Sequence, residues 1–183
     1  MRYTKSDPGE SPTDVRVEMS LAGRLNIRNN AWLLARLDYL WSNYFSDISQ
    51  DNPVFISFGK YSKLRLGSIK LDPRKGTSLI TITAMFKDIN IPVEVIDHTI
   101  AHELCHYTHG FSSPKEQAHK YPHSGGVIRR ELEERNLAHL YDAYQEWVKS
   151  YKVELQAQAR TRIRIVSKAS LRIKPKIRLK KFW

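Results

Sequence analysis

The stretch "VEVIDHTIAHELCHYT", residues 93–108, constrains the fold most, because its apolar residues recur at helical spacing. Pro92 suits the first turn of a helix, and Gly110 can end it. His102 and His106 are four residues apart, so they project from one helical face. A different face carries an apolar stripe that we expect to pack on a sheet: Val93, Ile96, Ile100, Leu104 and Tyr107.

His102, Glu103 and His106 form an H-E-x-x-H motif. Two imidazoles one helical turn apart can reach one zinc ion at about 2.0–2.1 Å. Glu103 is rotated by about 100° from His102, so it faces the cleft without joining the ligand pair. A carboxylate in that position can take a proton from metal-bound water. The motif therefore predicts one Zn²⁺ with Glu103 as the general base.

The spacing of the residues does not by itself identify the third metal ligand. His98 and His109 share the histidine face, but each is a turn or more beyond the pair, so we interpret them as residues that line the cleft. Ser112 stands where a metzincin would have its third histidine. Glu131 on the following helix, or His123 after the intervening loop, could complete the set.

The remaining elements predict an α+β fold. A helical pattern covers residues 29–45, with Asn29 or Asn30 as its cap. Three β-rich runs follow at 54–58, 65–71 and 78–84, and short connections favour a three-stranded antiparallel meander. After the motif helix and a polar loop, another helical pattern starts near Val127 and extends towards Gln158.

Two segments, "VEVIDHTIAHELCHYTH" and "YPHSGGVIRREL", resemble the SprT-like zinc metallopeptidases, including short YgjP-like relatives. The likeness covers roughly residues 25–150. It implies a minimal zincin-like fold with an N-terminal helix, the meander, the motif helix and a helix that presents the third ligand. It also implies zinc on His102, His106 and His123. His119 is the best substitute for His123, because it lies in the same loop.

The same resemblance implies a zinc-dependent endopeptidase, in which Glu103 assists the attack of zinc-bound water on a peptide bond. Candidate oxyanion donors are Tyr121, His119 and Arg129. Two departures stand out. Val127 replaces the usual aromatic residue after the third histidine, and one cysteine, Cys105, excludes the cysteine zinc ribbon that many members carry. Cys105 itself is expected to be a small buried residue.

The net charge of +11 is concentrated at the C-terminus. Residues 155–183 contain ten Lys and Arg and no Asp or Glu, which leaves 20 basic and 19 acidic residues in the first 154. We therefore expect a flexible leader at 1–13, a metallopeptidase domain at 14–154 and a basic C-terminal extension at 155–183.

Basic and apolar residues alternate along this extension, which predicts a strand or extended ribbon with one basic face. Clustered Lys and Arg favour DNA or RNA as a partner, while a solvated hairpin and an anionic membrane surface are alternatives. The SprT-like family includes proteases of DNA-bound proteins, so the extension would recruit the enzyme to such substrates. The candidate nucleic-acid contacts are Arg160, Arg162, Arg164, Arg172, Lys174, Lys176, Arg178, Lys180 and Lys181.

The alternative function is a nucleic-acid-binding module whose zinc site is structural or vestigial. No apolar run is long enough for a membrane span, and the first residues lack the apolar core of a signal peptide. These features and the single cysteine favour a cytoplasmic protein, with association to a nucleoid or nucleus through the extension.

Overall fold

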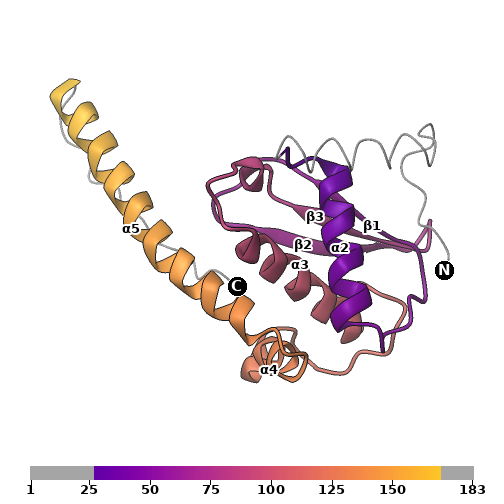
Figure 1. Cartoon of the computed structure of the whole chain (residues 1–183). Coiled ribbons are helices and arrows are strands. Elements are labelled where there is room, and N and C mark those ends of the chain that lie inside the picture. Colours follow the sequence, from indigo (N-terminus) through magenta and orange to yellow (C-terminus); the bar gives the residue numbers. More distant parts are fainter. Residues whose placement is uncertain (1–26, 170–183) are drawn as a thin grey trace.

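The computed structural model describes residues 27–169, with residues 159 and 161–169 described by their backbone. The chain is α+β, as expected, with a three-stranded sheet and α-helices around it (Figure 1). The expected leader at 1–13 and the part of the basic extension from residue 170 onward lie outside the described residues. The elements in chain order are α2 (Asn30–Tyr44), β1 (Val54–Phe58), β2 (Gly67–Asp72), β3 (Thr77–Ile82), η1 (Ala84–Lys87), α3 (Val93–Thr108), η2 (Ser124–Gly126), α4 (Val127–Glu134) and α5 (Ala138–Ala169).

The prediction of an antiparallel meander is wrong. The strand order is β1-β3-β2, in which β2 pairs with β3 antiparallel and β1 pairs with β3 in parallel. The segment between β1 and β2 crosses the end of β3, where the hydroxyl of Thr83 donates to the carbonyl of Ser62 at 2.8 Å. The amide of Gly59 donates to the carbonyl of Ile82, and the amide of Thr83 donates to the carbonyl of Leu66. These contacts carry the chain over β3, so β1 and β2 become the two edges of the sheet.

The sheet buries one face. Ile56, Ile80 and Ile69 lie in register across the three strands and are all buried. Leu79, on the opposite face of β3, is 42% exposed. Helix α2 packs on β1, and α3 packs on β2 and β3 (Figure 1). The single core therefore lies between the helices and the inner face of the sheet.

Helix α2 is capped as predicted, because the side chain of Asn29 accepts from the amide of Trp32 at 2.9 Å. Helix α3 follows Pro92 and covers the predicted residues. Its burial differs from expectation, since residues 95–107 are all buried and not only one stripe. The extra cover comes from α5, which packs along the histidine side of α3.

The helix expected to extend from Val127 towards Gln158 is two helices, α4 and α5. Asn136 has φ = 59°, a left-handed conformation that asparagine tolerates well. The amide of Asn136 donates to the carbonyl of Glu133, and the amide of Leu137 donates to the carbonyl of Leu132 at 2.7 Å. This is the hydrogen-bond pattern of a Schellman motif, which stops α4 and lets the chain turn.

Helix α5 crosses the expected boundary at 154/155 without interruption. The predicted strand at residues 160–165 is therefore wrong, because that segment is helical. Tyr151 donates to the sulfur of Met85 at 3.1 Å and Lys63 donates to Gln158 at 3.0 Å, so α5 stays attached to the body this far. The rest of α5 extends beyond the body in Figure 1. Among residues 27–169, no helix is long and apolar enough to cross a membrane.

The segment that leads into α3 is held by one buried cation. Arg28 is 6% exposed, and its Nη1 donates to the carbonyls of Phe86 and Asp88 at 3.1 and 2.7 Å. Its Nη2 donates to the carbonyl of Ile91 at 2.8 Å. The planar guanidinium thus binds carbonyls of η1 and of the segment that follows it, directly before α3 begins.

Replacing Arg28 with lysine should lower the free energy of unfolding by about 2–3 kcal/mol, because an ammonium cannot reach all these carbonyls and leaves some buried without a donor. Urea unfolding followed by circular dichroism measures the change. Arg129→Lys is the matched control, since Arg129 forms an exposed pair with Glu133. A loss below about 0.5 kcal/mol for Arg28→Lys, the range of ordinary surface changes, would contradict this role.

Candidate metal centre

Helix α3 supplies two imidazoles to the candidate centre. The ring centroids of His102 and His106 are 4.8 Å apart and the planes cross at 79°. The two side chains are 8% and 7% exposed. Their i, i+4 spacing places them on one face of the helix, as the motif predicts.

His123 joins this pair from the other end of the long loop. Its ring centroid lies 5.3 Å from that of His102 and 4.7 Å from that of His106. One ligand atom from each of the three imidazoles lies within 4.8 Å of the other two. Gly125 and Gly126 follow with φ of 65° and 69°, so the turn from His123 into α4 uses a backbone conformation that favours glycine.

The end of α3 directs the loop back over the motif. Gly110 has φ = 77°, and a Cβ there would lie 2.3 Å from the carbonyl oxygen of Glu116. The amide of Phe111 donates to the carbonyl of His106 at 2.9 Å, and the Phe111 ring meets the His106 ring edge to face. Gly110 is therefore required both for the turn and for the close return of the chain.

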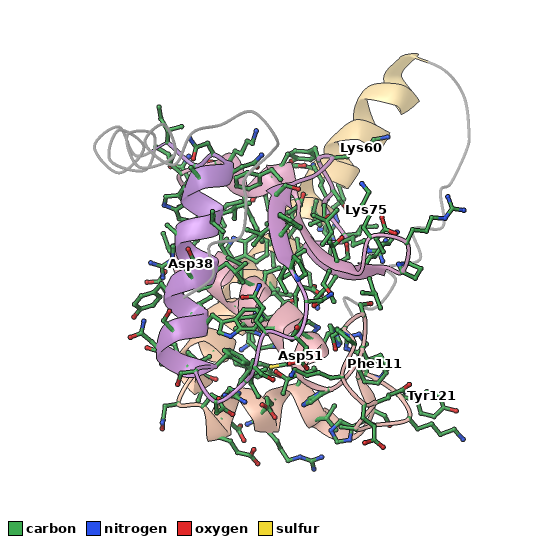
Figure 2. The ribbon with its side chains drawn as sticks, turned by 90° about the vertical axis from the view of Figure 1, so that its right-hand side faces the viewer. Asp38, Asp51, Lys60, Lys75, Phe111 and Tyr121 are labelled. Atoms are coloured by element: carbon green, nitrogen blue, oxygen red, sulfur yellow. The ribbon has the colours of Figure 1, made fainter. Side chains whose placement is uncertain are left out.

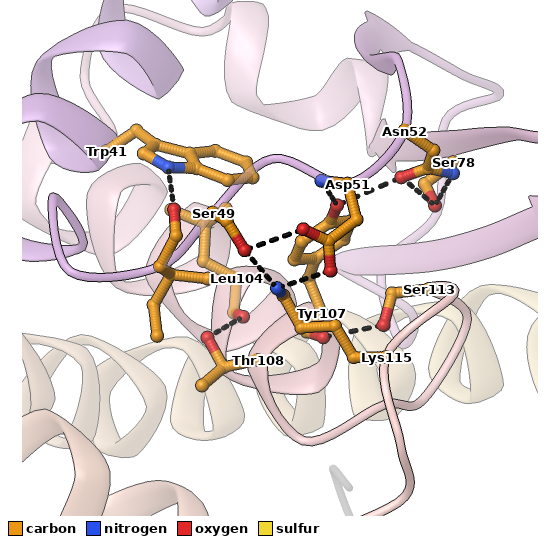
Figure 3. A network of polar contacts seen from close by, with 11 residues as sticks. Trp41, Ser49, Asp51, Asn52, Ser78, Leu104, Tyr107, Thr108, Ser113 and Lys115 are labelled. Carbon is orange, nitrogen blue, oxygen red and sulfur yellow. Dashed lines mark hydrogen bonds and ion pairs between the residues drawn. The ribbon is translucent and has the colours of Figure 1, made fainter.

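A polar network fixes the beginning of this loop (Figure 3). The hydroxyl of Tyr107 donates to the Asn52 side chain at 3.0 Å, and Ser113 donates to the carbonyl of Tyr107 at 2.7 Å. Lys115 pairs with Asp51 at 2.7 Å. The loop that carries His123 is thus fastened to the segment that leads into β1, far away in the sequence.

The three histidines fit a metal ion in their chemistry. Nitrogen ligands at 2.0–2.1 Å from a tetrahedral ion lie about 3.4 Å apart, within the range that these side chains span. Burial lowers the pKa of His106 to about 4 and also lowers the pKa values of His102 and His123. Neutral imidazoles are the form that binds metal. His123 is exposed, so the centre is open on its side.

Glu103 directly follows His102 in α3 and is 1% exposed. Burial raises the pKa of its carboxyl group to about 8, against the opposing effects of the Ile69 amide and Arg65. Its Oε1 has no hydrogen-bond partner among the described residues. A buried, unsatisfied carboxyl oxygen on the helix that supplies two of the three histidines is costly for folding alone, which is typical of a functional group.

The structure does not bring the other ligand candidates into the cluster. Nε2 of His109 lies 3.3 Å from a carboxylate oxygen of Glu131, whose second oxygen accepts from Arg135 at 2.7 Å. His119 packs edge to face on His109, with centroids 4.7 Å apart. Glu131 and His119 therefore take part in a neighbouring polar cluster that ties the loop to α4.

His98 is a cleft-lining candidate that the structure buries away from solvent. Its ring stacks on the ring of Tyr144 in α5, with the ring centroids 4.2 Å apart. Neither ring nitrogen of His98 has a hydrogen-bond partner within residues 27–169. Burial lowers its pKa to about 3. Cys105, on the same helix, is buried as expected, and burial raises the pKa of its thiol.

The candidate oxyanion donors differ in their surroundings. Arg129 pairs with Glu133 at 2.7 Å on the exposed side of α4. Tyr121 is 58% exposed and, with Phe111, belongs to the loop between α3 and α4 in Figure 2. No contact of Tyr121 fixes its hydroxyl towards the three histidines in the described part of the chain. The structure thus leaves this assignment without geometric support.

Strand β2 contacts Glu103, which the sequence patterns did not predict. A Cβ at Gly67 would lie 2.7 Å from Oε1 of Glu103, and the Ile69 amide faces the same carboxyl group. The available signal was the isolated glycine inside the strand-like run "RLGSIKL", since such a glycine often marks a close approach.

Comparison with known proteins adds no family to this geometry: no family model, no curated protein and no solved structure matches the chain.

His123→Ala should abolish high-affinity metal binding, because two imidazoles from one helix leave the coordination incomplete. Metal content after purification and dialysis, measured by atomic emission, tests this. His119→Ala is the matched control and should retain the metal. Equal metal loss in both variants, or full retention in His123→Ala, would contradict the ligand set.

Proposed function

We propose that this protein is a zinc-dependent endopeptidase of the SprT-like type. The observation that carries the proposal is the cluster of His102, His106 and His123, with Glu103 buried directly after His102 in α3. Three neutral imidazoles are the ligands of a catalytic zinc site with a vacant position, and a carboxyl group on the same helix can serve as its general base. A purely structural site has no need for that carboxyl group, which favours an enzyme over a binding module.

Each residue has a distinct role in the proposed reaction. The three imidazoles hold the ion, and Zn²⁺ bound there would supply Lewis-acid chemistry towards water and a peptide carbonyl. Glu103 accepts a proton from the attacking water at its unpartnered Oε1 and returns it to the leaving amine. The buried position of Glu103 keeps bulk solvent from competing for that proton.

Strand β2 favours an extended peptide as the substrate. It is an edge of the sheet, so one side of its backbone pairs with no strand among residues 27–169. Gly67 and Ile69, at the beginning of this strand, lie next to Glu103. A peptide added along the edge of β2 would bring its backbone close to the metal centre, in the manner of strand addition.

The basic extension supports recruitment by nucleic acid. Helix α5 carries the chain away from the body, and Arg160 on it is exposed. Arg162 and Arg164 lie further along the same helix, and the other candidate contacts, from Arg172 to Lys181, lie outside the described residues. Clustered Lys and Arg bind phosphates without sequence specificity, so the extension would bring the enzyme to proteins on DNA.

Glu103→Gln should retain one metal ion per chain and lose cleavage of an unfolded protein substrate by at least about 100-fold, because the amide cannot accept the proton. Gel-based cleavage assays with added Zn²⁺, and with a chelator in parallel, measure this. Glu94→Gln, an exposed change in the first turn of the same helix, is the control. Wild-type activity in Glu103→Gln would refute the mechanism.

Replacing the six basic residues from Arg172 to Lys181 with glutamine should weaken binding to duplex DNA and flatten its salt dependence. Each lost phosphate contact reduces the slope of log K against log salt by about 0.9. Fluorescence anisotropy at several salt concentrations measures both quantities. Arg74→Gln with Lys75→Gln, in the exposed turn between β2 and β3, is the control. An unchanged slope in the six-residue variant would exclude the extension as the DNA-binding element.

A further inference from the structure

Gly67 is the first residue of β2 and lies against the motif helix. A Cβ built on Gly67 would be 2.7 Å from Oε1 of Glu103 and 2.8 Å from Cγ2 of Thr99. Both distances are shorter than any normal non-bonded contact of a Cβ, so any other residue at position 67 would force these side chains or the strand to move. Thr99 and Glu103 are one helical turn apart, so they form a single surface under the strand.

The backbone of Gly67 does not require glycine. Positive φ values occur at Gly76, Gly110, Gly125 and Gly126, and Gly67 is not among these glycines. Its position in a regular antiparallel pair with Ile82 is one that alanine adopts readily. Glycine in a strand interior is, on its own, unfavourable. The reason for glycine here is therefore the space above Glu103.

That space determines where the carboxyl group lies. Glu103 is 1% exposed, and Oε1, the oxygen directly over Gly67, has no hydrogen-bond partner among the described residues. The Ile69 amide, two residues along β2, faces the same carboxyl group. The position of the Glu103 carboxyl group is thus limited by Gly67 on one side and by the Ile69 amide on another. Helix α3 fixes the Cα of Glu103.

We propose that Gly67 is a positioning residue for Glu103, which keeps the carboxyl group close under β2 and aligned for proton transfer at the metal centre. This inference rests on the proposed peptidase function. A side chain at position 67 would push the Glu103 carboxyl group away from β2, because its Cβ would lie 2.7 Å from Oε1. Misplacement of a catalytic group by about 1 Å can lower a rate by about 100-fold.

Gly67→Ala should therefore lower kcat by roughly 10- to 100-fold. KM for the same unfolded substrate should change by less than about threefold, since the affected group acts on a proton and not on substrate binding. Metal content should remain at one ion per chain, because the three atoms nearest to the new methyl group belong to Glu103 and Thr99 and not to a histidine. A kcat within twofold of wild type, or loss of the metal, would overturn the proposal.

Thr99→Ser provides the rescue. It removes Cγ2, one of the two atoms that the new Cβ would meet, and keeps the hydroxyl that donates to the carbonyl of Val95 at 2.8 Å. The double variant Gly67→Ala/Thr99→Ser should recover at least about fivefold of the kcat lost in Gly67→Ala, a non-additive result expected only for residues in contact. An additive result would overturn the proposal.

Gly59→Ala is the matched control for general crowding. Its Cβ would lie 2.4 Å from Cγ2 of Thr81 and meets no residue of α3. It should lower the melting temperature and leave kcat per folded molecule unchanged. A loss of kcat as large as that of Gly67→Ala would show a global effect and overturn the positioning role.

Thermal melting of the metal-free protein separates this inference from the peptidase proposal. Gly67→Ala should lower Tm by about 3 °C or more in the wild-type background and by clearly less in the Glu103→Ala background, where the collision is absent. If the Tm shift is smaller in the Glu103→Ala background but the wild-type protein cleaves no substrate, the peptidase proposal is refuted and the contact between Gly67 and Glu103 stands. Equal shifts in both backgrounds would refute the contact between Gly67 and Glu103, whatever the activity.

Discussion

The burial of residues 95–107 of α3 is the constraint on which the rest of the structure depends. A buried helix that carries many polar side chains must satisfy them, and most are satisfied: Asp97 pairs with Arg36, and Thr99 and Thr108 donate to carbonyls one turn earlier. Buried atoms without a hydrogen-bond partner, in the described part of the chain, include Oε1 of Glu103 and a ring nitrogen of His106. Both ring nitrogens of His98, which stacks on Tyr144, also have none. The unsatisfied groups of α3 therefore include residues of the candidate centre but are not confined to it.

Burial also sets the electrostatics of the centre. It raises the pKa of Glu103 to about 8 and lowers the pKa of His106 to about 4, so the site favours uncharged side chains at neutral pH. Neutral histidines are ready to bind a cation. A divalent ion would in turn favour the ionised form of Glu103, because opposite charges attract strongly at low dielectric. Metal binding and activation of the general base would therefore be coupled.

The third ligand depends on contacts that are distant in sequence. His123 reaches the pair on α3 because Gly110 turns the chain back and because Tyr107, Asp51 and Lys115 hold the loop to the segment before β1. Strand β2 approaches Glu103 and Thr99 of α3 through Gly67. Three parts of the chain thus meet at one helix, which explains how a small domain can bring together three histidines that could hold a metal ion.

The sequence by itself determined the local elements: the cap of α2 at Asn29, the extent of α3, and the pairing of His102 with His106, because helical periodicity and capping are properties of neighbouring residues. Only the tertiary structure decided the parallel pairing of β1 with β3, the break at Asn136 and the helical continuation of α5 past residue 155. It also decided that Gly67 lies against Glu103. These features depend on packing between segments far apart in the chain, which local patterns do not encode.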